Sequence, residues 1–468
     1  HNVQPRRQFS RTVACIRRSS SQTGNPIDTR KQVFCNRSLN MKNIVAIGFD
    51  MDYTLAQYKP ETFESLAYEG TTRKLVHDFG YPKELLDWSF DWTYMVRGLV
   101  LDKKGGNILK MDRHKYVKVA YHGFRELSKE EKVGFYGNTL LRNSFDEPDY
   151  ALIDTLFSLA EAYLFAQLVD FKDKNPRKLP DYARLYTDVR SAVDLCHRDG
   201  SLKQMVVKDP KRYIKDDVAL VPMLKMLRDS GRATFLVTNS LWDYTNVVMG
   251  FLCKSDWLQY FDVVISGSAK PGFFHEENKA NLFEVDLTTG MLRNTDNGNP
   301  MAHVGEESSF LQEKRSHKVF QGGNVAHIHK LLSIESSAQV LYVGDHIYGD
   351  ILRSKKIVGW RTMLVVPELE REVELLWETR DSRKNLRLLR NQRDLIEDEI
   401  HHLKSGLDDE TSDRLNDLQA RRNDARVRHQ DAQRQHHQMV GEIRFFNGYN
   451  LGVNLFWKLI SFIKCGGN

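Results

Sequence analysis

The sequence lacks cysteines at paired spacings, which argues against both a disulfide framework and a structural zinc site. Its five cysteines are scattered along 468 residues, at Cys15, Cys35, Cys196, Cys253 and Cys465. An odd number without regular spacing does not fit a disulfide framework or a structural zinc site. This usage is typical of a protein that works in a reducing compartment.

The sequence also lacks a long apolar run. The stretch LGVNLFWKLISFI near the end contains Lys458 and is shorter than the roughly 20 residues that span a bilayer. We therefore expect a folded body without a membrane partner. With 41% hydrophobic residues, the chain can still bury a substantial core, and its length favours two or three domains.

The chain has no excess of positive charge outside its first 40 residues. That leader holds eight Arg or Lys and one acid, Asp28, whereas the remainder has 60 basic and 61 acidic residues. The body therefore gives no reason to expect a nucleic acid partner. An Arg-rich, Ser-containing leader is typical of an organellar transit peptide, and equally of a disordered basic tail. We expect a cytoplasmic protein, or a mitochondrial or chloroplast one if the leader is a transit peptide.

Four short runs rich in Val, Ile, Leu and Phe end abruptly in polar residues. They are NIVAIGFDMD (43–52), ATFLVTNS (233–240), FDVVISGSAK (261–270) and QVLYVGDHIYGD (339–350). Continuous apolar runs are typical of strands covered on both faces, so we expect an α/β fold, a parallel sheet with helices on both faces. Ligands of such sheets bind beyond the carboxyl ends of the strands. Asp50, Thr238, Lys270 and Asp345 should therefore converge on one crevice.

About 180 residues separate the first two runs, too many for one crossover, and they predict a large insertion after the first strand. Within it, RGLVLDKKGGNILKM (97–111) predicts a hairpin around a Gly-Gly turn. The stretches 148–171 and 185–197 have apolar residues at helical spacing. We expect a mainly helical domain that forms a lid over the crevice and selects the substrate. Such a lid can contact parts of the substrate that the sheet does not reach.

Residues 368–440 contain no proline and are dominated by Glu, Arg, Gln, Asp and Leu. Apolar residues recur there at about helical spacing, and KSGLDDE (404–410) interrupts them: Leu386, Leu389, Ile396, Ile400 and Leu403. This pattern predicts a C-terminal helical hairpin arm. A solvated arm that packs on itself is the ordinary explanation, and a partner-binding or oligomerising coil is the alternative. A homo-oligomer therefore stays open.

These patterns predict five parts of the chain. We expect a basic leader at 1–40, a catalytic core at 41–58 and 226–366, an inserted substrate domain at 59–225, the arm at 367–440, and a C-terminal segment at 441–468 that packs back on the core. The core should carry the reaction and the insertion the choice of substrate.

Two carboxylates at the end of the first run need a cationic neighbour. Asp50 and Asp52 share a face if the strand continues through them, and such anions repel unless a metal or basic group lies nearby. Carboxylates are common ligands of Mg²⁺, and Asp50 and Asp345 each end a strand, so we expect Mg²⁺ there. An ionised Asp50 can attack phosphorus, whereas Asp52 is placed to move protons.

The other runs end in groups that suit phosphoryl transfer, which leaves negative charge on three oxygens. Lys270 would supply positive charge, and the Thr238 hydroxyl and the Asn239 amide would supply hydrogen-bond donors. Each also has an ordinary explanation as a turn or loop residue. Asp350 either supports the metal site or Lys270, or caps the helix that begins DILRSKK.

The motifs DMDYTL, LVTNS, AKPGFF and YVGDHIYGDI resemble, in order, the four motifs of the haloacid-dehalogenase superfamily. The residues within these motifs are similar to those of the cytosolic purine 5′-nucleotidase family and its nucleotidase-domain relatives. The resemblance covers roughly residues 41–366. It implies a Rossmann-like core in which Asp50 is the nucleophile and Asp52 the acid/base. It also implies a metal held by Asp50, the backbone carbonyl of Asp52, and Asp345.

A segment of the insertion, DVRSAVDLCHRDGSLK (188–203), resembles the part of that family that contacts the nucleotide. The resemblance implies that Arg190, Asp194, His197 and Lys203 contact the base and the ribose phosphate. The spacing agrees in part, because the first three lie at i, i+4 and i+7 and form one polar stripe of a helix. A surface Arg–Asp pair would have the same spacing.

The leading hypothesis is an Mg²⁺-dependent 5′-nucleotidase that hydrolyses nucleoside 5′-monophosphates, favouring purines, through an aspartyl phosphate. Transfer of the phosphoryl group to a second nucleoside would add phosphotransferase activity. One alternative is a phosphatase of another small phosphate ester. Another is a non-catalytic scaffold that works through the arm, although none of the expected catalytic positions is replaced.

Overall fold

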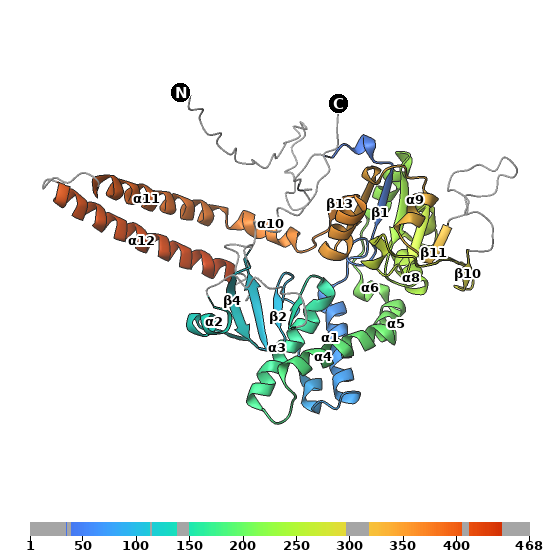
Figure 1. Ribbon diagram of the computed structural model, residues 1–468, viewed down its shortest axis with the longest axis horizontal. Helices are drawn as coiled ribbons and strands as arrows, with labels where there is room; N and C mark the ends of the chain where they lie inside the picture. Colours follow the sequence, from blue (N-terminus) through green and yellow to red (C-terminus); the bar gives the residue numbers. More distant parts are fainter. Residues whose placement is uncertain are drawn as a thin grey trace.

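The computed structural model describes residues 34, 39–112, 115–137, 149–295, 318–404 and 411–441. Figure 1 shows a core of strands and helices, an insertion that follows the first strand, and a helical arm that projects from the body. The core contains a largely parallel sheet. This α/β architecture confirms the fold class predicted from the sequence.

The core sheet has eight strands in the order β10-β9-β11-β8-β7-β1-β12-β13. Their bounds are β1 Ala46–Phe49, β7 Ala233–Val237, β8 Val263–Ser266, β9 Leu282–Val285, β10 Leu292–Asn294, β11 Lys318–Gly322, β12 Val340–Gly344 and β13 Arg361–Leu364. All pairs are parallel except those of β9 and β10, which form an antiparallel edge. The four apolar runs form β1, β7, β8 and β12, which are neighbours, so their carboxyl ends meet at one edge.

Both faces of this sheet are buried, which explains the continuous apolar runs. The core helices are α7 Leu220–Asp229, α8 Trp242–Cys253 and α9 Val325–Leu331, with short turns η2 Met41–Asn43, η5 Trp257–Tyr260, η6 Gly272–Phe274, η7 Ser337–Gln339, η8 Ile347–Leu352 and η9 Ser354–Val358. Ile47 of β1 packs in one apolar cluster with Met249 of α8, whereas Ala46 packs in another with Ile328 of α9. Because adjacent strand residues point to opposite faces, helices cover both faces, as predicted.

Gly48 of β1 makes room for two aromatic rings at the centre of the sheet. It lies opposite Phe235 of β7 and Tyr342 of β12, whose rings stack with centroids 6.4 Å apart. A Cβ atom at this position would lie 2.2 Å from the Phe235 ring. The missing side chain therefore makes room for the Phe235 ring, which stacks on Tyr342. The Tyr342 hydroxyl reaches Lys270 at the carboxyl edge of the sheet.

The insertion combines helices with a second, antiparallel sheet in the order β5-β4-β3-β2-β6. The strands are β2 Val100–Asp102, β3 Asn107–Met111, β4 Val117–His122, β5 Arg125–Glu126 and β6 Tyr150–Leu152. The helices and short turns are α1 Pro60–His77, η3 Lys83–Asp87, α2 Lys129–Tyr136, η4 Leu156–Ser158, α3 Leu159–Lys174, α4 Tyr182–Arg198, α5 Ser201–Lys208 and α6 Pro210–Tyr213. The helices account for most of the insertion.

Two sequence predictions for the insertion have different outcomes. The hairpin at 97–111 is confirmed, because β2 and β3 pair with Val100 opposite Leu109. The stretch 148–171 is helical only from η4 and α3 onward, because its first residues form β6, which pairs with β2. The apolar spacing of that stretch did not reveal the strand.

The arm begins with α10 Leu369–Glu378 and continues as α11 Arg380–Lys404, which packs along α12 Thr411–Gly441. Ion pairs between Glu399 and Arg414 and between Glu397 and Arg426 join the two long helices. The helices run in opposite directions, and the end of α11 and the start of α12 lie far from the body (Figure 1). The predicted helical hairpin is confirmed.

Some predictions lie beyond the described residues. Residues 1–33 and 442–468 are outside the described part of the chain, so the leader and the C-terminal segment stay predictions, as do the domain boundaries. No helix within the described part combines the length and the apolar character that a bilayer crossing requires.

Replacing Gly48 with alanine should destabilise the protein by about 1–3 kcal/mol, because the added methyl group overpacks the ring of Phe235. Urea denaturation measures this change. Gly250→Ala on α8 is a matched control, since its Cβ would meet no atom within 4 Å, and it should keep or slightly raise the stability. Equal stability of Gly48→Ala and the wild type would show that the two rings do not depend on this gap.

Candidate active site

A buried lysine joins two carboxylates at the carboxyl edge of the sheet. Lys270, which follows β8, places its Nζ 2.7 Å from Asp50 Oδ1 and 2.8 Å from Asp350 Oδ1. The same Nζ donates to the Tyr342 hydroxyl at 3.1 Å. Burial disfavours the charge on Lys270, but the two carboxylates outweigh this effect and raise its pKa. Lys270 is therefore a buried cation at neutral pH.

Asp345, which follows β12, completes a cluster of three buried carboxylates. Asp50, Asp345 and Asp350 each offer an oxygen, and these atoms lie within 4.8 Å of one another. Burial raises the pKa of Asp50 to about 7, although Lys270 opposes the shift. Burial also raises the pKa of Asp345, and the Asp50 and Asp350 charges raise it further. One lysine therefore does not balance the negative charge of this cluster.

The donor set of this cluster fits a divalent cation. Asp345 Oδ2 is buried and accepts no hydrogen bond from the described residues, and its nearest cationic partner, Arg97 Nη1, is 3.9 Å away. Hard carboxylate oxygens are the ligands that Mg²⁺ prefers. A cation bound there would relieve the repulsion among the carboxylates and satisfy the free oxygen.

Asp350 contacts Lys270 and does not cap η8. The cap of η8 is His346, whose Nδ1 accepts a hydrogen bond from the Gly349 amide. Asp350 Oδ2 instead accepts from the His346 amide at 3.3 Å. Gly344 leaves space for this carboxylate, because a Cβ there would lie 2.7 Å from Asp350 Oδ2. Of the two explanations for Asp350, support of Lys270 fits its contacts.

Asp52 is held by hydroxyl groups rather than by a cation. Tyr58 donates to Asp52 Oδ1 at 2.6 Å and Ser240 donates to Oδ2 at 2.8 Å. The Tyr58 hydroxyl is also 2.8 Å from that of Tyr244. Lys203 of α5 donates to Ser240 Oγ at 3.4 Å. The insertion thus reaches Asp52 through one serine hydroxyl.

Thr238 and Asn239, which follow β7, position the loop that carries Lys270. The Asn239 amide accepts from the Lys270 backbone N–H at 2.6 Å and donates to the Lys270 carbonyl at 3.0 Å. Thr238 is fully buried, and its carbonyl accepts from the Ser268 amide at 3.0 Å. Their predicted role as donors to a phosphoryl group stays a prediction.

Arg190, Asp194 and His197 lie on α4, and Arg190 makes its ion pairs within the insertion. Arg190 donates to Glu161 of α3 at 2.8 Å and also to Asp194. Burial lowers the pKa of His197, and the charges of Lys203 and Arg190 lower it further. Among the described residues, neither Arg190 nor Asp194 pairs with a core side chain. Of the four predicted contact residues, Lys203 is the one that contacts a hydrogen-bond partner of Asp52, namely Ser240.

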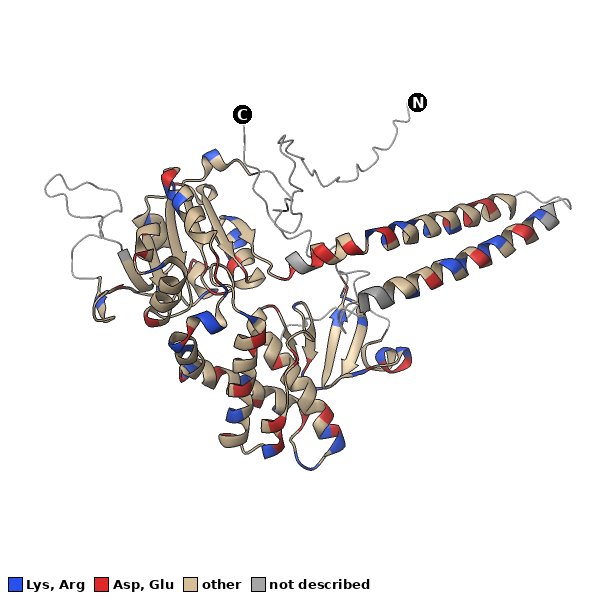
Figure 2. Cartoon of the chain, turned by 180° about the vertical axis from the view of Figure 1, so that it is seen from behind, with Lys and Arg blue, Asp and Glu red and all other residues tan. Residues whose placement is uncertain are grey.

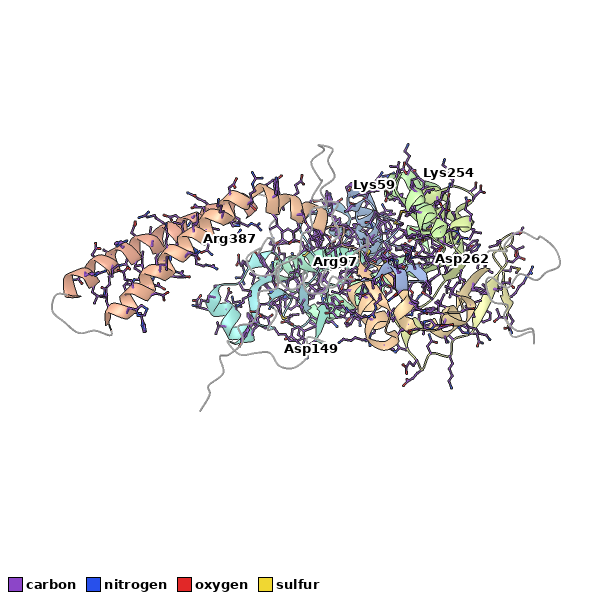
Figure 3. All side chains as sticks on the ribbon, turned by 90° about the horizontal axis from the view of Figure 1, so that it is seen from above. Lys59, Arg97, Asp149, Lys254, Asp262 and Arg387 are labelled. Carbon is purple, nitrogen blue, oxygen red and sulfur yellow. The ribbon has the colours of Figure 1, made fainter. Side chains whose placement is uncertain are left out.

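Sequence reasoning missed Arg97, which lies where the core, the insertion and the arm meet (Figure 3). Its guanidinium donates to both oxygens of Glu368, at 2.6 and 2.7 Å, and to the Asp345 carbonyl at 2.9 Å. The Arg97 side chain is only 5% exposed. Arg97 and Glu368 are 271 residues apart, so no local spacing connects them.

Comparisons with known proteins identify the family of the chain. The family model described as the 5′ nucleotidase family matches residues 33–445. The chain belongs to this family. A 5′-nucleotidase domain-containing protein of Dictyostelium discoideum is 30% identical over 353 residues, and human 5′-nucleotidase domain-containing protein 2 is 29% identical over 362 residues. The alignments cover 73% and 74% of this chain and 56% and 64% of those relatives.

Solved phosphatase structures are similar to this member of the 5′-nucleotidase family only at a low level. A putative phosphatase from Clostridium difficile has a TM-score of 0.27 at 13% identity, over 69% of this chain and 86% of that one. A magnesium-bound HAD-hydrolase from Bacillus subtilis has a TM-score of 0.23 at 12% identity, over 69% and 88%. Scores this low do not bear on the function of the chain.

Glu64 of α1 is a buried acid in the same region that the sequence did not single out. It is 3% exposed, and its Oε2 has no hydrogen-bond partner among the described residues. Burial raises the pKa of Glu64 to about 8, and the charges of Glu368 and Glu61 add to the shift. With Phe157, Glu161 and His197 it lines an enclosed cavity of about 10 Å³.

Glu64 should make the protein less stable as the pH rises. Its pKa is raised from 4.5 to about 8 on folding, so the folded state binds the proton more tightly and this stability is lost between those values. The loss approaches ~1.4 kcal/mol per pH unit. Denaturation from pH 5 to 8 should therefore show a steeper decline for the wild type than for Glu64→Gln.

The control for this profile is Glu69→Gln on the same helix, where the glutamate side chain is 59% exposed. This variant should follow the wild-type profile. Parallel profiles for the wild type and Glu64→Gln would contradict the assignment of a buried, protonated Glu64.

Proposed function

We propose that this chain is an Mg²⁺-dependent phosphatase of nucleoside 5′-monophosphates, with Asp50 as its nucleophile. The observation that carries the proposal is the single buried cluster of Asp50, Lys270, Asp345 and Asp350 at the carboxyl ends of β1, β8 and β12. Membership of the 5′-nucleotidase family supports the same reaction class. Purine preference follows only from the resemblance of the motifs.

In the first step, an Asp50 oxygen attacks phosphorus and the bond from phosphorus to the ribose oxygen breaks. Asp52 gives a proton to that oxygen, and the product nucleoside leaves. Both Asp52 oxygens accept hydrogen bonds from hydroxyl groups, which orient the carboxyl group and leave a lone pair on each oxygen for the proton. Asp50 then carries the phosphoryl group as an aspartyl phosphate.

In the second step, Asp52 takes a proton from water as the water oxygen attacks phosphorus. The bond between phosphorus and Asp50 breaks, which releases inorganic phosphate and restores the Asp50 carboxylate and the protonated Asp52. A nucleoside hydroxyl in place of water would give the phosphotransferase reaction. Lys270 would stabilise the negative charge on the transferred oxygens while Asp350 keeps it in position.

The residues that would hold Mg²⁺ are Asp50, Asp345 and the backbone carbonyl of Asp52, with Asp350 close by. When bound, the ion supplies positive charge to the phosphoryl oxygens and keeps Asp50 ionised despite its burial. Thr238 and Asn239 would complete the phosphoryl site. Arg190, Asp194, His197 and Lys203 would contact the nucleotide from the insertion.

Replacing Asp50 with asparagine should lower phosphate release by at least ~10³-fold, because the amide is a poor nucleophile. Phosphate release is measured on a panel of nucleoside monophosphates and other phosphomonoesters, at millimolar Mg²⁺ and again with EDTA. The exposed Asp256→Asn in the core is the control and should keep full activity. An unchanged rate for Asp50→Asn would contradict the assignment of Asp50 as the nucleophile. Equal rates across the panel would contradict the preference for nucleotides.

Replacing Arg190 with alanine should raise KM for the nucleotide by about tenfold with a smaller change in kcat, because a charged contact is lost. Arg184→Ala is a matched control, since Arg184 lies on the same helix and also pairs with a buried acid, Asp188. Both variants should lose some stability, but only Arg190→Ala should change KM. Equal KM values would exclude Arg190 from the nucleotide site.

A further inference from the structure

The exposed side of α11 carries a second stripe of residues, opposite the seam that packs on α12. The stripe consists of Lys384, Leu388, Asn391, Leu395 and Asp398, all exposed. The two leucines are 53% and 68% exposed. These positions alternate three and four residues apart, which is the spacing of a coiled-coil contact face. A second helix laid along α11 would therefore meet all five.

The groove beside this stripe is basic at the end nearer the body. An open groove of about 470 Å³ is lined by Arg380, Asp381, Lys384, Arg387, Leu388 and Asn391. Figure 3 shows Arg387 on the arm. Lys384 forms no ion pair with another described residue. An acidic surface would fit here.

The arm itself supplies such an acidic surface at its far end. The half of α11 nearer the body, residues 380–393, has six basic residues and one acidic residue, whereas the distal half, residues 394–404, has four acidic residues and one basic residue. Figure 2 shows charged residues along both long helices. Asp394 and Asp398 mark the acidic half of α11 itself.

We propose that two copies of this chain associate through the outer stripes of their α11 helices, in antiparallel orientation. Antiparallel pairing places the basic half of one arm on the acidic half of the other, whereas parallel pairing would place like charges together. The leucines then lie near the centre, close to Asn391. The two bodies sit at opposite ends of the paired arms, so they do not collide.

Sedimentation equilibrium of the full chain tests this interface. The mass should rise with concentration from 54.4 kDa toward twice that value, and the association should weaken with added salt because screening reduces the attraction. A chain that stays monomeric at every concentration would overturn the proposal and leave the stripe to a different partner.

Two charge-reversed variants give a sharper test. Lys384→Glu with Arg387→Glu leaves only acidic charges on the stripe, and Asp394→Lys with Asp398→Lys leaves only basic ones. Each variant alone should associate at least tenfold more weakly than the wild type, and an equimolar mixture should recover a dimer that contains one of each. A folding defect could not produce this recovery, so its absence would overturn the proposal.

The matched control places the same charge change on α12. Arg428→Glu with Arg434→Glu alters two exposed side chains outside the stripe and should leave the dimer intact. Weakening equal to that of the stripe variants would assign the effect to net charge alone and would overturn the assigned interface.

Discussion

The ion pairs that Lys270 makes with Asp50 and Asp350 are the interaction on which the rest of the site depends. β7 lies between the strands that carry Lys270 and Asp50, so the lysine must reach across it. The side chain of Asn239 holds both backbone polar groups of Lys270, and the Tyr342 hydroxyl accepts a hydrogen bond from its ammonium. Without Lys270 two carboxylates would be buried with no counterion, a cost of several kcal/mol.

A second buried cation connects this cluster to the outer parts of the molecule. Arg97 of the insertion joins Glu368, at the start of the arm, to the backbone of Asp345. A second contact between insertion and core is the His346–Asp154 pair at 3.1 Å. Burial lowers the pKa of His346, but the Asp154 carboxylate outweighs it and raises the value. The loop that carries Asp345 and His346 is therefore held by two charged residues of the insertion.

The strand ends could be predicted from the sequence because each apolar run ends in a polar or charged residue that suits catalysis. Parallel strands bring these ends to one edge of the sheet. The sequence left Asp350 open between a support of the site and a helix cap, whereas Asp50, Lys270 and Asp345 follow from this rule. Arg97 and Glu368 do not, because they are 271 residues apart and no local pattern joins them. The contact of Asn239 with Lys270 depends on loop conformation, and strand β6 is too short to stand out from the helical pattern beside it. Ser240 lies within a recognised motif, so its position was a usable signal for a contact with Asp52.

The cavity between α1, α3 and α4 constrains how a nucleotide could bind. It encloses about 10 Å³, room for about one water molecule, and a nucleobase is far larger. If a nucleotide contacts His197 through this cavity, α4 must therefore move relative to α1, or Phe157 must turn out of the cavity. Such a movement would open the environment of Glu64, whose Oε2 lacks a partner in the described conformation. A ligand that forms a hydrogen bond with Glu64 would satisfy this group.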